Sequence, residues 1–165
     1  MSGPLFRFLD EDHARLDTLL QRATNFPGQI DRAAYAEFRA GLLKHISMEE
    51  KILLPAARRA RGGEPLPLAT KLRLDHGALA ALLVPTPTPA IIAALRTIVV
   101  AHNEIEEGSG GVYETCEQLV DKEVATLLTQ LSTAPEVLVS PHFDGSKALE
   151  AARRALVRAG YECKI

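Results

Sequence analysis

Two segments of the sequence repeat a histidine followed, four residues later, by a pair of glutamates. They read His45-Ile-Ser-Met-Glu49-Glu50 and His102-Asn-Glu-Ile-Glu106-Glu107. In each segment the histidine and the first glutamate fall on the apolar stripe of a predicted helix, so both side chains are expected to face the core. A buried carboxylate is costly unless it is paired or binds a metal. The repeated pattern therefore indicates metal ligation.

Each segment belongs to a longer internal duplication. Asp12-His13 and Asp75-His76 each open the pattern Asp-His-x-x-Leu-x-x-Leu-Leu, one predicted helix before a His-x-x-x-Glu-Glu segment. A single histidine on an apolar stripe is more often a hydrogen-bonded core residue than a ligand. Four of them on four helices, with a glutamate one turn beyond two of them, favour a shared metal site. The candidate ligands are His13, His45, Glu49, His76, His102 and Glu106.

The types of these side chains indicate which metals they would hold. Imidazole and carboxylate ligands exclude a soft thiolate site and fit iron, manganese or zinc. One glutamate from each hairpin could bridge two ions. Two ions held by four histidines and two glutamates is the simplest count that uses all the candidates.

Helical periodicity predicts an all-α chain that positions these residues on four helices. The expected ranges are Pro4 to about Thr24, an N-cap at Asp31 to about Arg61, Leu68 to Val84, and Pro89 to beyond Glu106. Gly108-Ser-Gly-Gly111 should kink or interrupt the fourth helix, after which helix resumes from Val112 to about Leu131. We expect an up-down-up-down four-helix bundle over residues 1–131.

The remaining residues, 132–165, are expected to form a C-terminal extension. A last helix should begin after Ser146 as its N-cap, end at Ala159, and be followed by Gly160. Its apolar face predicts that it packs on the bundle, at a position that the sequence does not specify.

Composition restricts the class of protein. The chain has 165 residues, of which 47% are hydrophobic, enough for one domain with a sizeable core. A net charge of -2 without a basic face argues against nucleic-acid binding. The sequence contains neither a membrane-spanning apolar run nor a signal sequence, so we expect a cytoplasmic protein that does not bind membranes. Cys116 and Cys163 lack metal-type spacing and are expected to be free thiols.

At the duplicated histidines and glutamates the chain resembles the hemerythrin-like family, whose members carry HHE cation-binding domains. The resemblance covers about residues 1–131. It implies a four-helix bundle that holds two iron ions in a non-haem di-iron centre, with four terminal histidines and two bridging glutamates. These would be His13, His45, His76 and His102, and Glu49 and Glu106. Such centres bind dioxygen or nitric oxide, sense oxygen or redox state, store iron, or help to repair damaged iron sites.

One departure from the family pattern bears on function. Oxygen carriers of this family have His-x-x-x-His on the third helix, whereas here Ala80 stands four residues after His76. We therefore expect a protein that binds or senses a small diatomic ligand such as dioxygen or nitric oxide. The alternatives are a di-iron oxidase or a peroxidase acting on peroxide, an iron donor for repair, and a structural bundle with a zinc site. The sequence names no protein partner and does not decide whether the chain is an enzyme.

Four further side chains lie near the repeats or could reach the proposed site. Glu50 and Glu107 point about 100° away from the neighbouring ligands, so they should support the ligands or face solvent. Tyr113 is an alternative redox or hydrogen-bonding residue at the centre, although a position elsewhere is favoured. His142 lies outside the repeats and is expected in a loop, with a role as a fifth histidine ligand less favoured.

Overall fold

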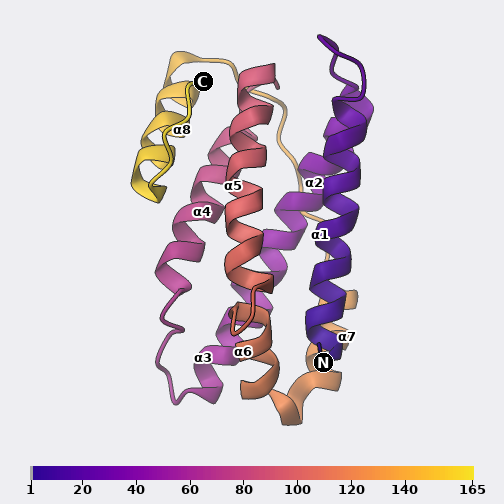
Figure 1. Cartoon of the computed structure of the whole chain (residues 1–165), viewed down its shortest axis with the longest axis vertical. Helices are drawn as coiled ribbons and strands as arrows, with labels where there is room; N and C mark the ends of the chain where they lie inside the picture. The colour runs from indigo at the N-terminus through magenta and orange to yellow at the C-terminus, as the bar shows by residue number, and fades with distance from the viewer. Residues whose placement is uncertain (1) are drawn as a thin grey trace.

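The computed structural model describes residues 2–165, which contain helices and no strand. Four long helical segments lie side by side along the longest axis of the molecule (Figure 1). They are α1 (Pro4–Ala23), α2 (Arg32–Met48) with its continuation, α4 (Ala69–Leu82) and α5 (Pro89–Glu107). The predicted all-α class is confirmed.

Signals at the helix ends explain most of these boundaries. The carboxylate of Asp31 accepts hydrogen bonds from the backbone N–H groups of Ala33 and Ala34, which caps the start of α2 as expected. Gly62 and Gly63 both have positive φ angles, 68° and 101°, and end the second helical segment where the sequence predicted.

A π-helical turn, Glu49–Leu53, joins α2 to α3 (Leu54–Ala60) without ending the helix. The N–H of Leu54 donates to the carbonyl of Glu49, five residues earlier. Pro55 provides a reason for this wider turn, because proline has no N–H to donate and its ring would clash with the carbonyl four residues before it. The sequence predicted one continuous helix here and missed the π turn.

The glycine-rich segment interrupts the fourth helix, as predicted. After it come α6 (Val112–Leu119), a short 3₁₀ turn (Asp121–Glu123) and α7 (Val124–Ser132) at the lower end of the bundle (Figure 1). The sequence expected one helix from Val112 to Leu131, so the break after Leu119 is a correction. It allows α7 to pack against α1, and neither glycine nor proline marks it in the sequence.

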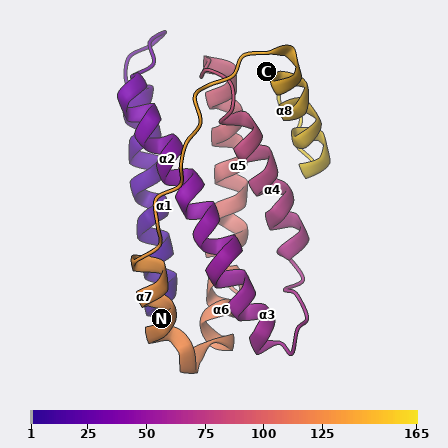
Figure 2. The ribbon, with the colours of Figure 1, turned by 180° about the vertical axis from the view of Figure 1, so that it is seen from behind.

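Residues 133–145 run without regular secondary structure along α2 to the opposite end of the molecule (Figure 2). The buried guanidinium of Arg39 fixes this segment to the bundle by donating to the carbonyls of Leu83, at 2.7 Å, and Ser140, at 2.8 Å. Phe143 N–H donates to the carbonyl of Val84. The last helix, α8 (Ser146–Ala159), packs on α4.

The predicted N-cap of α8 is wrong by one residue. Gly145 occupies the cap position, and Ser146 is the first helical residue, with no side-chain cap bond. Gly160 follows the helix with a φ of 89°, as expected.

The apolar core is divided by a layer of polar side chains. One hydrophobic cluster, which includes Leu16 and Leu79, lies on one side of the layer, and a second, which includes Leu9 and Leu72, lies on the other. His13 follows Leu9 by one turn and precedes Leu16 by one turn, and His76 has the same relation to Leu72 and Leu79. The candidate ligands therefore lie at mid-height in the bundle. Over residues 2–165, each helix lacks either the length or the apolar character needed to cross a bilayer.

Candidate metal centre

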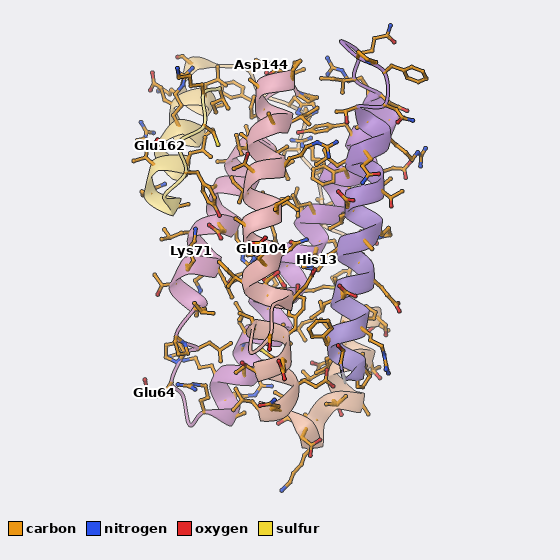
Figure 3. All side chains as sticks on the ribbon, viewed as in Figure 1. His13, Glu64, Lys71, Glu104, Asp144 and Glu162 are labelled. Atoms are coloured by element: carbon orange, nitrogen blue, oxygen red, sulfur yellow. The ribbon has the colours of Figure 1, made fainter. Side chains whose placement is uncertain are left out.

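The six candidate ligands converge in the polar layer from four helical segments. His13, labelled in Figure 3, comes from α1 and lies between α1 and α5. Each of the six side chains is at most 7% exposed, which agrees with the expectation that they face the core. Their convergence requires an explanation, because uncompensated burial of so many ionisable groups is costly.

The six residues form two groups of four that share both glutamates. The first group contains His13, His45, Glu49 and Glu106, and the second contains Glu49, His76, His102 and Glu106. Within each group, one ligand atom from every residue lies within 4.8 Å of the others, a geometry that could hold a metal ion. The two hairpins therefore contribute to both groups.

Each glutamate directs one carboxylate oxygen toward each group. Oε1 of Glu49 lies 3.4 Å from His45 Nε2, and its Oε2 lies 3.0 Å from His76 Nε2. Oε2 of Glu106 lies 3.5 Å from His13 Nε2, and its Oε1 lies 3.1 Å from His102 Nε2. This is the arrangement needed for a carboxylate that bridges two cations.

Every one of the four imidazoles directs its other nitrogen, Nδ1, toward a separate carboxylate. His45 Nδ1 donates to Asp12 at 2.8 Å, and His102 Nδ1 donates to Asp75 at 3.2 Å. The other two pairs are His76 with Glu50, at 2.8 Å, and His13 with Glu107. Because an ionised carboxylate only accepts, Nδ1 must carry the hydrogen, and in a neutral imidazole the Nε2 lone pair then faces the centre.

These lone pairs provide a test of whether the residues suit a cation. His76 Nε2 and His102 Nε2 lie 3.1 Å apart, and two acceptor nitrogens at this distance need a positive charge between them. The buried Oε2 of Glu49 faces His76 Nε2 at 3.0 Å, and within the described residues it has no hydrogen-bond donor when that nitrogen carries no hydrogen. Both observations are expected if a cation binds among these atoms, so the residues fit a metal.

Without a metal, protons on the histidines can supply part of the positive charge that this site favours. Burial opposes protonation of His45, but Glu49 and Asp12 outweigh it and raise its pKa to about 10. Burial likewise opposes protonation of His102, whereas Asp75 and Glu106 raise its pKa to about 10. The polar layer thus stabilises positive charge strongly.

The two glutamates differ in their protonation. Burial raises the pKa of Glu49, but the neighbouring His45 and His76 outweigh it and hold the pKa well below its ordinary value. Burial and repulsion by Glu49 raise the pKa of Glu106. The two adjacent carboxylates therefore favour a state in which only one of them is ionised, and additional positive charge would allow both to ionise.

Tyr113 is the centre's main departure from sequence expectation. Its ring is 1% exposed, and its hydroxyl lies among all four members of the first group. The distances from this oxygen are 2.6 Å to Glu49 Oε1, 3.0 Å to Glu106 Oε2, 3.1 Å to His13 Nε2 and 3.2 Å to His45 Nε2. Burial, together with the charges of Glu49 and Glu106, raises the pKa of Tyr113 well above its ordinary value.

The roles of Asp12 and Asp75 were missed, although a signal for them is present. Both residues immediately precede a candidate histidine in the duplicated segments, so they share one place in the internal repeat. By contrast, His142 lies away from the centre, with its Nδ1 3.3 Å from the carbonyl of Val84 and its ring beside Tyr35. The expectation that His142 lies in a loop agrees with this position.

Residues 5–134 match the family model described as the hemerythrin HHE cation-binding domain. Comparisons with curated proteins and with solved structures gave no match. The matched region contains all six candidate ligands and covers most of the sequence. The chain therefore belongs to the hemerythrin HHE cation-binding domain family.

Proposed function

We propose that this protein holds two iron ions in the polar layer and binds a small diatomic ligand, such as dioxygen or nitric oxide, at that centre. The observation that carries the proposal is the sharing of Glu49 and Glu106 between two histidine pairs, with one oxygen of each carboxylate directed to each pair. Imidazole and carboxylate donors suit iron, and manganese or zinc could use the same ligands. A bound iron pair would supply redox-active positions for the small ligand.

Residues around the six candidate ligands orient the imidazoles and keep the centre dry. Asp12, Glu50, Asp75 and Glu107 orient the four imidazoles, while the hydrophobic clusters on both sides of the layer exclude bulk water. The expected up-down-up-down order of the four long helices is part of the proposal. It is supported by the short connections between consecutive helices, because short loops join antiparallel neighbours.

A small cavity supports a small ligand. It is bounded by His45, Glu49 and His102 on the side of the centre and by apolar side chains including Phe38 and Leu79 elsewhere. Its free volume, about 10 Å³ for the centre of a water-sized molecule, corresponds to about one water. This space suits a diatomic molecule better than an organic substrate.

Metal loading followed by rapid mixing tests the proposal. Protein loaded anaerobically with ferrous iron should bind two ions, and Glu49→Gln should reduce that number because an amide keeps one oxygen, loses the negative charge and cannot bridge two ions. Exposed Glu11→Gln is a matched control on α1 and should still bind two. Mixing with nitric oxide should change the visible spectrum reversibly. Loss of iron on gel filtration, or an unchanged spectrum with nitric oxide, would contradict the proposal.

A second candidate, turnover of peroxide at the same centre, is favoured by the buried Tyr113 hydroxyl beside Glu49. The two candidates differ in stoichiometry. A binding protein should take up ligand once per site and release it unchanged, whereas an enzyme should consume many equivalents of peroxide when a reductant is supplied. Measuring peroxide consumption by iron-loaded protein, with and without a reductant, separates them.

A further inference from the structure

The Tyr113 hydroxyl has more polar neighbours than a phenol can satisfy. Four atoms lie within 3.2 Å of it: one carboxylate oxygen each from Glu49 and Glu106, and Nε2 of His13 and His45. Metal binding requires ionised carboxylates and neutral imidazoles, and in that state all four atoms accept, because the hydrogens of the two imidazoles are on Nδ1. A phenol has a single hydrogen to donate, so it can satisfy one of these four acceptors.

The distances around this hydroxyl are also close to those expected within a coordination polyhedron. Metal–ligand bonds of roughly 2.0–2.2 Å place neighbouring ligand atoms of an octahedron about 2.8–3.1 Å apart. The four distances from the Tyr113 oxygen, 2.6, 3.0, 3.1 and 3.2 Å, lie close to this range. The hydroxyl therefore stands where a ligand adjacent to all four of the other ligand atoms would stand.

Among residues 2–165, the second group has no equivalent of Tyr113. The Nε2 atoms of His76 and His102 lie 3.1 Å apart. Each of these nitrogens also faces one glutamate oxygen, from Glu49 and Glu106 respectively. Tyr113 enters only the first group because Gly108–Gly111 breaks the fourth helix and α6 turns the ring back over Glu106. The two candidate metal positions therefore differ chemically, although duplicated segments of the sequence form them.

We propose that Tyr113 is a fifth protein ligand, bound as phenolate, for the cation held by His13, His45, Glu49 and Glu106. On coordination the phenol O–H bond breaks, an oxygen–metal bond forms, and the proton leaves to solvent. The first position then has five protein ligands and the second has four. With one solvent-derived oxygen shared by both ions, the first ion would have six ligands and the second would have five, so exogenous small ligands should bind the second ion. This inference rests on the proposed iron centre and adds a ligand to it.

Resonance Raman spectroscopy of ferric-loaded protein tests the phenolate directly. Excitation in a phenolate-to-iron charge-transfer band should enhance tyrosine ring modes, and these modes should shift in protein made with ring-deuterated tyrosine. Tyr113→Phe should abolish the band and the modes. Tyr35→Phe is the matched control, because Tyr35 is equally buried, at 1% exposed, and lies beside Phe38 and His142. It should retain both.

A titration with azide provides a second readout. Wild-type protein should bind one azide for every two irons, and Tyr113→Phe should bind two. Two bound irons without enhanced tyrosine modes, or two azides in the wild type, would overturn the inference while leaving the iron centre intact. Failure to bind iron would overturn both proposals. If Tyr113→Phe does not fold, the isotope shift in wild-type protein still decides the question.

Discussion

At the scale of single residues, the centre depends on carboxylates that contact Nδ1 of each imidazole, the nitrogen directed away from the candidate metal positions. Asp12 shows this most directly, because its Oδ2 accepts from His45 Nδ1 at 2.8 Å. The interaction fixes the ring orientation and makes Nε2 a better donor to a metal. Replacing this carboxylate should weaken metal binding without removing a ligand.

We predict that Asp12→Asn lowers metal affinity by roughly 10–100-fold, the range typical of groups that support a ligand. Competition with a chelator of known affinity measures the change. Glu11→Gln removes one negative charge from the same helical turn at an exposed position, and should leave the affinity nearly unchanged. Equal metal affinities for the two variants would show that only the loss of a negative charge matters, and not the contact with His45.

The pH dependence of stability gives a second prediction, for metal-depleted protein. The pKa of His45 and of His102 is raised to about 10 because, despite burial, nearby carboxylates favour the protonated form. A raised pKa stabilises the folded state fully below the unfolded value of about 6.5, and this contribution is lost as pH rises toward 10. The melting temperature of chelator-treated protein should therefore fall between roughly pH 6 and pH 9.

Metal-loaded protein should respond in the opposite direction over the same range. Protons compete with the metal for the imidazoles, so binding strengthens as pH rises. The difference in melting temperature between loaded and depleted protein should widen, and calorimetry at several pH values measures it. A depleted protein that becomes more stable toward pH 9 would contradict the assignment of charge to these histidines.

The sequence could predict which ligand candidates converge because helical spacing and the duplication both constrain them. It could not place Tyr113. That side chain follows a glycine-rich break, and the direction of a helix after such a break depends on tertiary packing.

At the scale of helices, Gly111 determines how closely α6 follows α5. A Cβ at this position would lie 2.7 Å from each of three backbone carbonyl oxygens, those of Ile105, Glu106 and Gly108. These are backbone atoms of the helix end and cannot move aside as a flexible side chain would. Glycine is therefore required for the turn that returns Tyr113 to the centre.

We predict that Gly111→Ala lowers the free energy of unfolding by roughly 1–3 kcal/mol, the usual cost of forcing extra volume into a packed site. Gly77→Ala is the control, because a Cβ there meets nothing within 4 Å on an exposed face of α4. It should stabilise the protein by about 0.4–1 kcal/mol. Denaturant unfolding measures both, and a neutral Gly111→Ala would mean that the turn can relax.

Helix ends with chemical signals were predictable from the sequence, including the Asp31 cap and the glycines that follow α3 and α8. The unmarked break near Val120 was not, because the chain turns there to bury Val120 and to place α7 against α1. The π turn was also missed. Pro55 signals a disturbed helix, but the sequence alone does not say whether the chain will break, kink or widen.

At the scale of the whole molecule, α8 is integrated with the bundle. Its buried residues Ala152, Ala155 and Leu156 belong to the same hydrophobic cluster as Leu79 and Leu82 of α4. Lys71, labelled in Figure 3, adds a polar link by donating to Asp75 at 2.6 Å and to the carbonyl of Ala159 at 2.8 Å. Asp75 in turn accepts from His102, so α8 is connected to the centre through two side chains.

We predict that residues 2–165 unfold as one cooperative unit and that Leu156→Ala destabilises all of it by roughly 2–5 kcal/mol, the cost of emptying a buried leucine site. Leu156 is 1% exposed, whereas its neighbour Val157 is 75% exposed, so Val157→Ala is a matched control that should change stability by less than about 0.5 kcal/mol. Unfolding followed by both far-ultraviolet circular dichroism and tyrosine fluorescence should give coincident transitions that shift together in Leu156→Ala. If α8 instead formed a separate unit, the variant would lose a small helical signal at low denaturant while the main transition stayed in place.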